Sequence, residues 1–176
     1  MNTTTFALLA SSLAFCVGCA STNQPHSGSG MTAVDPDRRA ISAVLDDFHA
    51  AASKADGERY FAHFAPDAVF LGTDDTERWT VSQFRAYADP HFSKGQGWTY
   101  TTATRFISLA PDGRSAWFDE QLDNAKYGRC RGSGILVKHE GAWRIAQYNL
   151  TVPIPNDLLP EVAQRIREHQ SQALPN

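Results

Sequence analysis

The hydrophobic period of this sequence changes once, near residue 98. Before that point apolar residues recur at helical spacing, as in Ile41, Val44, Leu45, Phe48 and Ala52. After it come segments rich in Thr, Val, Ile and aromatic residues, separated by turn residues such as Ala110-Pro-Asp-Gly113 and Glu140-Gly141. Helices followed by strands predict an α+β fold.

Caps and breakers set the boundaries of the expected elements. Asp35-Pro36 is a helix N-cap followed by a proline suited to the first helical position. A short second helix carries Tyr60, Phe61 and Phe64 and stops at Pro66, and Ala68–Leu71 is a brief strand ending at Gly72. Thr80 and Gln83 make a capping-box signature for a third helix. The alternation of apolar residues after residue 98 predicts four strands, at Trp98–Leu109, Ser115–Leu122, Arg129–His139 and Trp143–Val152. Helical spacing then predicts a last helix at Asp157–His169.

Four long strands in sequence order predict an antiparallel meander. A sheet of this length must curl because its strands twist. Helices packed on its inner face then leave a conical cavity between helix and sheet, which is a natural small-molecule site.

The first 34 residues differ from the rest because they contain no Asp, Glu, Lys or Arg. The apolar run Phe6–Phe15 has the length of a signal-peptide core and is too short for a membrane span, which needs ~20 apolar residues. The stretch Phe15-Cys16-Val17-Gly18-Cys19 resembles a bacterial lipobox, whose last Cys is lipidated, although Cys16 stands where Leu is usual and no Lys or Arg precedes the run.

These features predict three parts. Residues 1–18 form a lipoprotein-type signal peptide, residues 19–34 a Ser/Gly/Pro-rich tether, and residues 35–176 the folded domain. We expect an exported protein, held at the membrane of the bacterial cell envelope through a lipid on Cys19. Translation from Met31 is the alternative. Cys130 is then the remaining thiol, and we expect it to be buried and without a disulfide.

Four stretches within residues 40–152 carry a family pattern: Tyr60–Phe70, Gly72–Trp79, Ala116–Asp119 and Gly141–Asn149. Through them the folded part resembles the nuclear transport factor 2-like superfamily, and within it the SnoaL-like domain family. The resemblance implies a curled antiparallel sheet packed on N-terminal helices around a conical cavity. It does not select a function, because the superfamily contains ketosteroid isomerase, dehydratases, cyclases, hydrolases and domains without a known reaction.

Strand alternation groups the polar candidates by face. Trp117, Asp119 and Gln121 share one face of their strand, and if it is the concave one they meet Arg131, Gln147 and Asn149 from the next two strands. Asp119 is then the candidate general acid or base, because a carboxylate in an apolar cavity has a raised pKa; ketosteroid isomerase, of this fold, is the known example. The structural alternative is a cross-strand ion pair between Asp119 and Arg131. Arg131 is also a candidate clamp for a ligand carboxylate.

Two further segments are candidates. Glu77 and Trp79 are expected at the rim of the cavity, with Trp79 as a core plug being the alternative. His91, beside Pro90, is a candidate acid or base, although a lone His at a helix end is commonly structural. The His and Cys spacing predicts no metal site, and no phosphate-binding motif or cofactor signature is present. Gly128, Gly132 and Gly134 are expected to permit a bend or bulge.

Three functions remain open from the sequence. The preferred one is a lipid-anchored domain that binds an unidentified small molecule. The second is an isomerase, dehydratase or cyclase that uses Asp119 for proton transfer. The third is a dimerisation or protein-interaction module, so a homodimer is also expected. The net charge of −3 excludes a strongly basic nucleic-acid binder as the default.

Overall fold

The computed structural model describes residues 35–173. The first helix, α1 (Pro36–Ser53), begins where the sequence predicts: the Asp35 side chain accepts a hydrogen bond from the Asp37 N–H, and Pro36 occupies the first turn. The helices α2 (Gly57–Phe61) and α3 (Val81–Phe92) follow, and the capping box of Thr80 and Gln83 is formed. The last helix is α4 (Leu159–Ala173). None of the described helices is long and apolar enough to cross a membrane.

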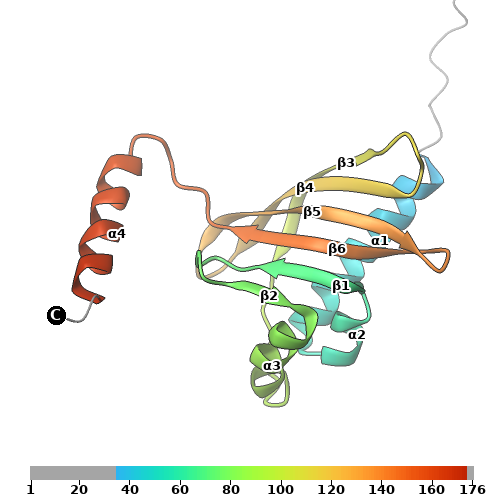
Figure 1. The fold of residues 1–176 in the computed structure, drawn as a ribbon, viewed down its shortest axis with the longest axis horizontal. Helices are drawn as coiled ribbons and strands as arrows, with labels where there is room; N and C mark the ends of the chain where they lie inside the picture. Colours follow the sequence, from blue (N-terminus) through green and yellow to red (C-terminus); the bar gives the residue numbers. More distant parts are fainter. Residues whose placement is uncertain (1–34, 174–176) are drawn as a thin grey trace, which may run out of the picture. The chain divides into compact units, whose positions relative to one another are not determined.

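Within residues 35–173, six strands form one curled sheet in the order β2-β1-β6-β5-β4-β3 (Figure 1). The predicted meander is confirmed, with antiparallel pairs joining β3 (Thr101–Leu109), β4 (Ser115–Asn124), β5 (Gly128–His139) and β6 (Ala142–Thr151). The first strand, β1 (Phe64–Leu71), is longer than expected and includes Pro66. The loop after it contains an unpredicted strand, β2 (Arg78–Thr80).

The sheet is mixed, which corrects the expectation of a wholly antiparallel one. β1 pairs in parallel with β6, so a segment near the N-terminus joins the far edge of the meander. Sequence periodicity contains no information about pairing between strands so far apart in the chain. The α+β class itself is confirmed.

The core lies between the sheet and the helices α1, α2 and α3, which Figure 1 shows on one side of the sheet. Ile41, Leu45 and Phe48 of α1 pack on inward residues of the strands, including Phe118, Leu136 and Ile145. Register shifts interrupt three strand pairs, β1–β6, β3–β4 and β5–β6. Such bulges bend strands, and here they accompany the curl around the helices.

Candidate functional site

One cavity, here called the main cavity because it is the less open one, lies between α3, β1, β2 and the irregular segment 96–100; two more open surface grooves are larger. The main cavity has a volume of about 220 Å³. The lining is dominated by rings, with a few polar groups among them: Phe70, Gly72, Thr73, Glu77, Trp79, Phe84, Tyr87, Trp98, Tyr100, Tyr127 and Leu150. An apolar cavity with a small number of polar groups has the usual composition of a small-molecule site.

Stacked rings hold one wall of this cavity in place. Phe70 and Phe84 stack with centroids 3.9 Å apart, and Trp79 stacks on Tyr87 with centroids 4.9 Å apart. Offset-stacked aromatic pairs are favourable beyond the area that they bury. Because Phe70 and Phe84 are buried and Tyr87 is half-exposed, the stack runs from the core to the cavity mouth.

The turn after β1 places Glu77 at the cavity. The Gly72 N–H donates to the Glu77 carbonyl oxygen at 2.9 Å, and the Asp74 N–H donates to Glu77 Oε2 at 3.2 Å. A Cβ at residue 72 would collide with the Glu77 side chain in this position, so the glycine lets that side chain pack against the turn. Glu77 therefore faces the cavity with its carboxylate held by the backbone.

A narrow pocket lies beside the main cavity, on its core side. It has a volume of about 10 Å³ and shares Phe70, Trp98, Tyr100 and Leu150 with the main cavity. Its deep end is formed by Phe48, His49, Ala52, Tyr60 and Tyr148. His49 and Tyr100 also line a groove on the surface, together with Asp46, Ala50, Ser53 and residues 99–102. His49 and Tyr100 therefore line both this narrow pocket and the solvent-facing groove.

Glu120 is the centre of a buried polar cluster beside this deep end. Its side chain is 0% exposed, and Oε1 lies 2.7 Å from His49 Nε2 and accepts a hydrogen bond from the Tyr148 hydroxyl at 3.0 Å. Oε2 accepts a hydrogen bond from Arg105 Nε at 2.8 Å. A Cβ at Gly132 would collide with the Tyr148 hydroxyl, so this glycine makes room for the cluster.

The cluster keeps Glu120 ionised and Tyr148 protonated. Burial by itself would raise the pKa of Glu120, but the hydrogen bonds and charges of His49 and Arg105 outweigh it and lower the pKa below the ordinary value. Burial first, and then the Glu120 charge, raises the pKa of Tyr148 well above its ordinary value. Burial, with Cys130 and Tyr127 nearby, raises the pKa of Tyr100 to about 12. Glu120 is thus an acceptor, and both phenols are donors.

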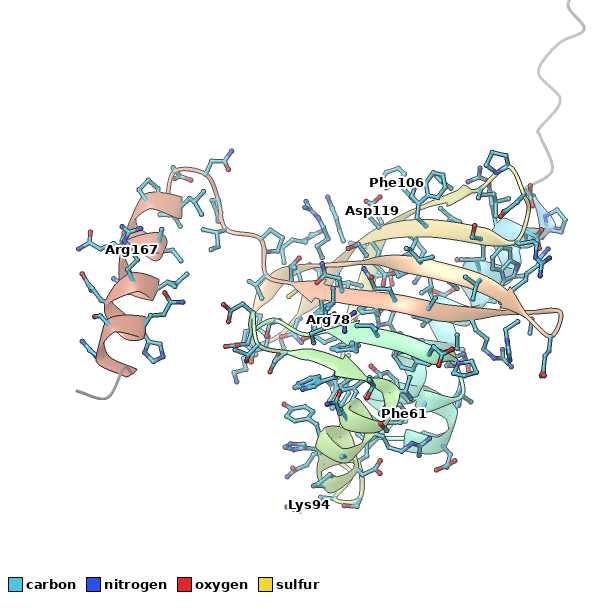
Figure 2. The ribbon with its side chains drawn as sticks, in the orientation of Figure 1. Phe61, Arg78, Lys94, Phe106, Asp119 and Arg167 are labelled. Carbon is cyan, nitrogen blue, oxygen red and sulfur yellow. The ribbon has the colours of Figure 1, made fainter. Side chains whose placement is uncertain are left out.

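The structure places the predicted β4 candidates on the other face of the sheet. Trp117, Asp119 and Gln121 are exposed, whereas Phe118, Glu120 and Leu122 point into the core. Figure 2 shows Asp119 beside Phe106, its register partner on β3. The expected concave position of these residues is therefore wrong, because alternation fixes which residues share a face but not which face is covered.

The candidates on β5 and β6 lie on the same outer face. Arg131 is exposed and pairs in register with Gln121, so Asp119 instead faces Ser133. On β6 the register shift at Ala146 reverses the alternation: Trp143 and Ile145 are buried before it, and Tyr148 is buried after it. Gln147 and Asn149 consequently turn away from the core, which corrects their predicted place in the cavity.

The remaining predicted residues divide between the cavity and the surface. Glu77 and Trp79 line the main cavity, as the expected rim. His91 is exposed, with its ring 5.5 Å from the Tyr87 ring, and lies outside the cavity lining. Cys130 is buried, as predicted. The lipidation candidate Cys19 lies outside the described residues. Within residues 35–173 no group of three or more His, Cys, Asp or Glu side chains is arranged to hold a metal ion.

Sequence reasoning missed His49 and Glu120, although a signal was present for each. Glu120 is the single charged residue in the inward series Ala116, Phe118, Glu120, Leu122. His49 adjoins Phe48 on the apolar stripe of α1. A charged side chain on an otherwise apolar face needs a hydrogen-bonding partner when it is buried, and this requirement could have predicted a contact between Glu120 and His49.

The family model for the SnoaL-like domain matches residues 41–155 of this sequence. The chain belongs to the SnoaL-like domain family. The matched range spans the helices α2 and α3, all six strands and most of α1. It contains His49, Arg105, Glu120 and every residue of the cavity lining. No curated protein matches the sequence.

Solved structures with the same fold include three bacterial proteins. A domain of unknown function with a cystatin-like fold from Nostoc punctiforme has a TM-score of 0.62 at 16% identity, covering 77% of this chain and 91% of its own. An NTF2-like protein of unknown function from Pseudomonas putida has a TM-score of 0.55 at 14% identity, covering 66% and 87%. A candidate scytalone dehydratase from Novosphingobium aromaticivorans has a TM-score of 0.55 at 13% identity, covering 67% and 85%. At these identities the likeness shows the fold.

Proposed function

We propose that this SnoaL-like domain binds one planar, largely apolar small molecule in the main cavity. The supporting observation is the aromatic lining of a cavity of about 220 Å³. Ring faces favour a flat ligand that stacks on them, because offset stacking adds to the gain from burial. Trp79 and Tyr87 form the stacked wall on which such a ligand would lie.

The polar groups of the cavity define the rest of the ligand. The Glu77 carboxylate at the mouth accepts hydrogen bonds, so it favours a ligand with a hydroxyl or N–H group at that end. The Tyr100 hydroxyl has no hydrogen-bond partner among the described residues and borders the inner end, so it can donate to a ligand carbonyl. The expected ligand is therefore an aromatic molecule with a carbonyl at its inner end and a hydroxyl or N–H group at the mouth, and 2-acetylnaphthalene supplies its rings and its carbonyl.

Calorimetric titration with 2-acetylnaphthalene tests this proposal. We expect binding of one molecule per chain, weakened about tenfold in Trp79→Leu, the cost of trimming an aromatic anchor. Trp117→Leu is the matched control, because Trp117 is exposed on the opposite face of the sheet and should leave the affinity within about twofold. Absence of binding to the natural sequence, or an equal loss in both variants, would contradict the proposal.

We also propose that the domain is exported and anchored by a lipid on Cys19. The support is the uncharged leader with its short apolar run and the residues before Cys19. Mass spectrometry of the membrane-extracted protein should find Cys19 as the first residue, carrying a diacylglyceryl group. The Cys19→Ser variant should retain the leader. An unmodified N-terminus at Met1 or Met31 in the natural protein would rule out the anchor.

A further inference from the structure

We infer that the molecule bound in the main cavity is an organic cation, whose ammonium group lies at the cavity mouth against the Glu77 carboxylate. The inference rests on the proposed function, because the rings of the ligand must first occupy the cavity. It narrows the hydroxyl or N–H group expected at the mouth to a positively charged nitrogen. The class of ligand is then an aromatic ketone that also carries an amine protonated at neutral pH.

Glu77 carries a charge that the described part of the chain does not neutralise. Its side chain is half-buried, and no Lys, Arg or His within residues 35–173 forms an ion pair with it. In that range its carboxylate accepts a single hydrogen bond, from the Asp74 N–H to Oε2 at 3.2 Å, and Oε1 has no partner. A half-buried carboxylate has lost part of its hydration, so a cation beside it compensates for that loss.

The other acidic side chains that are buried or half-buried within residues 35–173 each have a structural partner. They are Asp37 with Lys138, Asp47 with Arg59, Glu120 with Arg105, and Asp56 with the first turn of α2. In this group it is Glu77 that lines a cavity and has no cation. A positively charged ligand group supplies the partner that the neighbouring side chains do not.

The lining of the main cavity favours a cation over an anion. It contains no Lys, Arg or His, and Glu77 is its one carboxylate. Five of the lining residues are Trp or Tyr, and they come from β2, α3, the segment 96–100 and the turn before β5: Trp79, Tyr87, Trp98, Tyr100 and Tyr127. Aromatic faces attract cations, and groups of such rings recognise ammonium ligands. One of these rings already does so, because Lys126 Nζ lies over the Tyr127 ring, 4.9 Å from its centroid.

The charged side chains around the mouth do not place a competing cation beside Glu77. Asp74 and Asp75, in the same loop, are exposed acids that add to the negative potential. Arg78 precedes Trp79 in β2, and successive strand residues point to opposite faces, so Arg78 points away from the cavity that Trp79 lines. Lys126 lines a neighbouring surface groove and not the main cavity.

The position of the ammonium group at the mouth limits the cost of binding a charge. Tyr87 and Tyr127 are 49% and 48% exposed, so a ligand group at this end of the cavity keeps contact with water. The desolvation penalty that makes fully buried ion pairs costly is therefore reduced. The rings of the ligand still enter the cavity, with the carbonyl toward Tyr100 and the charged nitrogen toward Glu77.

Calorimetric titration with three naphthyl ketones of different charge tests the inference. 2-Acetyl-6-(aminomethyl)naphthalene is a cation at pH 7, 2-acetyl-6-(hydroxymethyl)naphthalene is neutral, and 6-acetyl-2-naphthoate is an anion. We expect the natural chain to bind the amine about tenfold more tightly than the alcohol, and the anion about tenfold more weakly than the alcohol. The alcohol controls for hydrogen bonding, because its hydroxyl can donate to Glu77 without a charge. This comparison needs no variant that must fold.

A pair of variants then assigns the preference to Glu77. In Glu77→Gln the affinities for the amine and the alcohol should lie within about twofold of each other, while the alcohol binds within about threefold of its affinity for the natural chain. Asp75→Asn is the matched control, because it removes an exposed carboxylate of the same loop that does not line the cavity. Solvent and salt screen that charge, so the preference for the amine should change by less than about twofold.

The outcomes separate this inference from the proposed function. Equal binding of the amine and the alcohol by the natural chain would overturn the inference, and so would an equal loss of the preference in the two variants. In either case the binding of the alcohol and of 2-acetylnaphthalene would leave the proposed function standing. Failure of the natural chain to bind any of the four naphthyl compounds would remove both.

Discussion

Arg105 and Glu120 form an ion pair in the interior, with the guanidinium Nε 2.8 Å from Oε2 and side-chain exposures of 7% and 0%. The same guanidinium reaches α1, where Nη1 donates to Asp46 Oδ1 at 2.7 Å and to the Ser42 carbonyl oxygen at 3.1 Å. One arginine on β3 therefore neutralises the buried carboxylate of β4 and ties both strands to the helix that carries His49.

Replacement of Arg105 by Met should strongly destabilise the fold. The change leaves Glu120 buried without its cation, and loss of one partner from a buried pair typically costs about 3–5 kcal/mol. Urea denaturation followed by circular dichroism measures the free energy of unfolding. Arg85→Met is the control, because the Arg85–Glu58 pair has exposures of 36% and 91% and should contribute at most about 1 kcal/mol. Equal decreases in the free energy of unfolding for the two variants would show that Arg105 does not stabilise the fold more than an exposed arginine does.

Stability should fall in acid, partly because of Glu120. The folded-state pKa of Glu120 is below its unfolded value of about 4.3, so its contribution is complete above that value and is lost as pH falls through the folded pKa. Unfolding free energies measured between pH 7 and pH 3 should fall more steeply for the natural chain than for Glu120→Gln. Asp37 and Asp47 also have lowered pKa values and remain in both proteins, so the difference isolates Glu120. If the unfolding free energies of the two proteins fell equally with pH, the lowered pKa of Glu120 would be contradicted.

The element order could be predicted because it depends on local patterns. The apolar stripe of α1, the Asp35 cap and the capping box of Thr80 are short-range signals, and each appears in the structure. The short strand β2 lacked such a signal. It exists because Val69, Phe70 and Leu71 of β1 offer a partner edge to residues 78–80.

The site could be predicted less well because it depends on which sheet face the helices cover. The alternation on β4 correctly separated Asp119 from Glu120, yet only the packing of α1 on the sheet decides that Glu120 is inside. On β6 a single extra residue, Ala146, reverses the faces of everything after it. The rim residues Glu77 and Trp79 were predicted correctly because Glu77 lies in a loop and Trp79 directly after it, so their placement did not depend on strand alternation.

The close approach of Gly97 to α1 should not tolerate a side chain. A Cβ at residue 97 would collide with the Ala52 carbonyl oxygen, which also accepts the Trp98 N–H at 3.2 Å. The obstacle is a backbone atom, which cannot move aside as a side chain can. Gly97→Ala must therefore displace the segment whose Trp98 and Tyr100 side chains line the cavity. We expect the free energy of unfolding, measured by urea denaturation, to fall by about 1–3 kcal/mol, and 2-acetylnaphthalene to bind more weakly. Gln96→Ala, at an exposed position, is the control, and comparable effects of the two would refute this reading.

The outer face of the sheet should pair two copies of the chain. Trp117 and Ile135 face each other in register between β4 and β5, and Phe106 lies on β3 opposite the neighbouring Asp119; their exposures are 52%, 42% and 66%. Exposed apolar side chains gathered in this way mark an interaction surface. Sedimentation equilibrium of a chain starting at Met31 should show a dimer, and Trp117→Lys should give a monomer through the cost of burying charge. Tyr127→Lys changes a half-exposed ring outside the patch and should leave the dimer intact. A monomeric natural chain at ~100 μM, well above the Kd of a stable interface, would exclude this pairing.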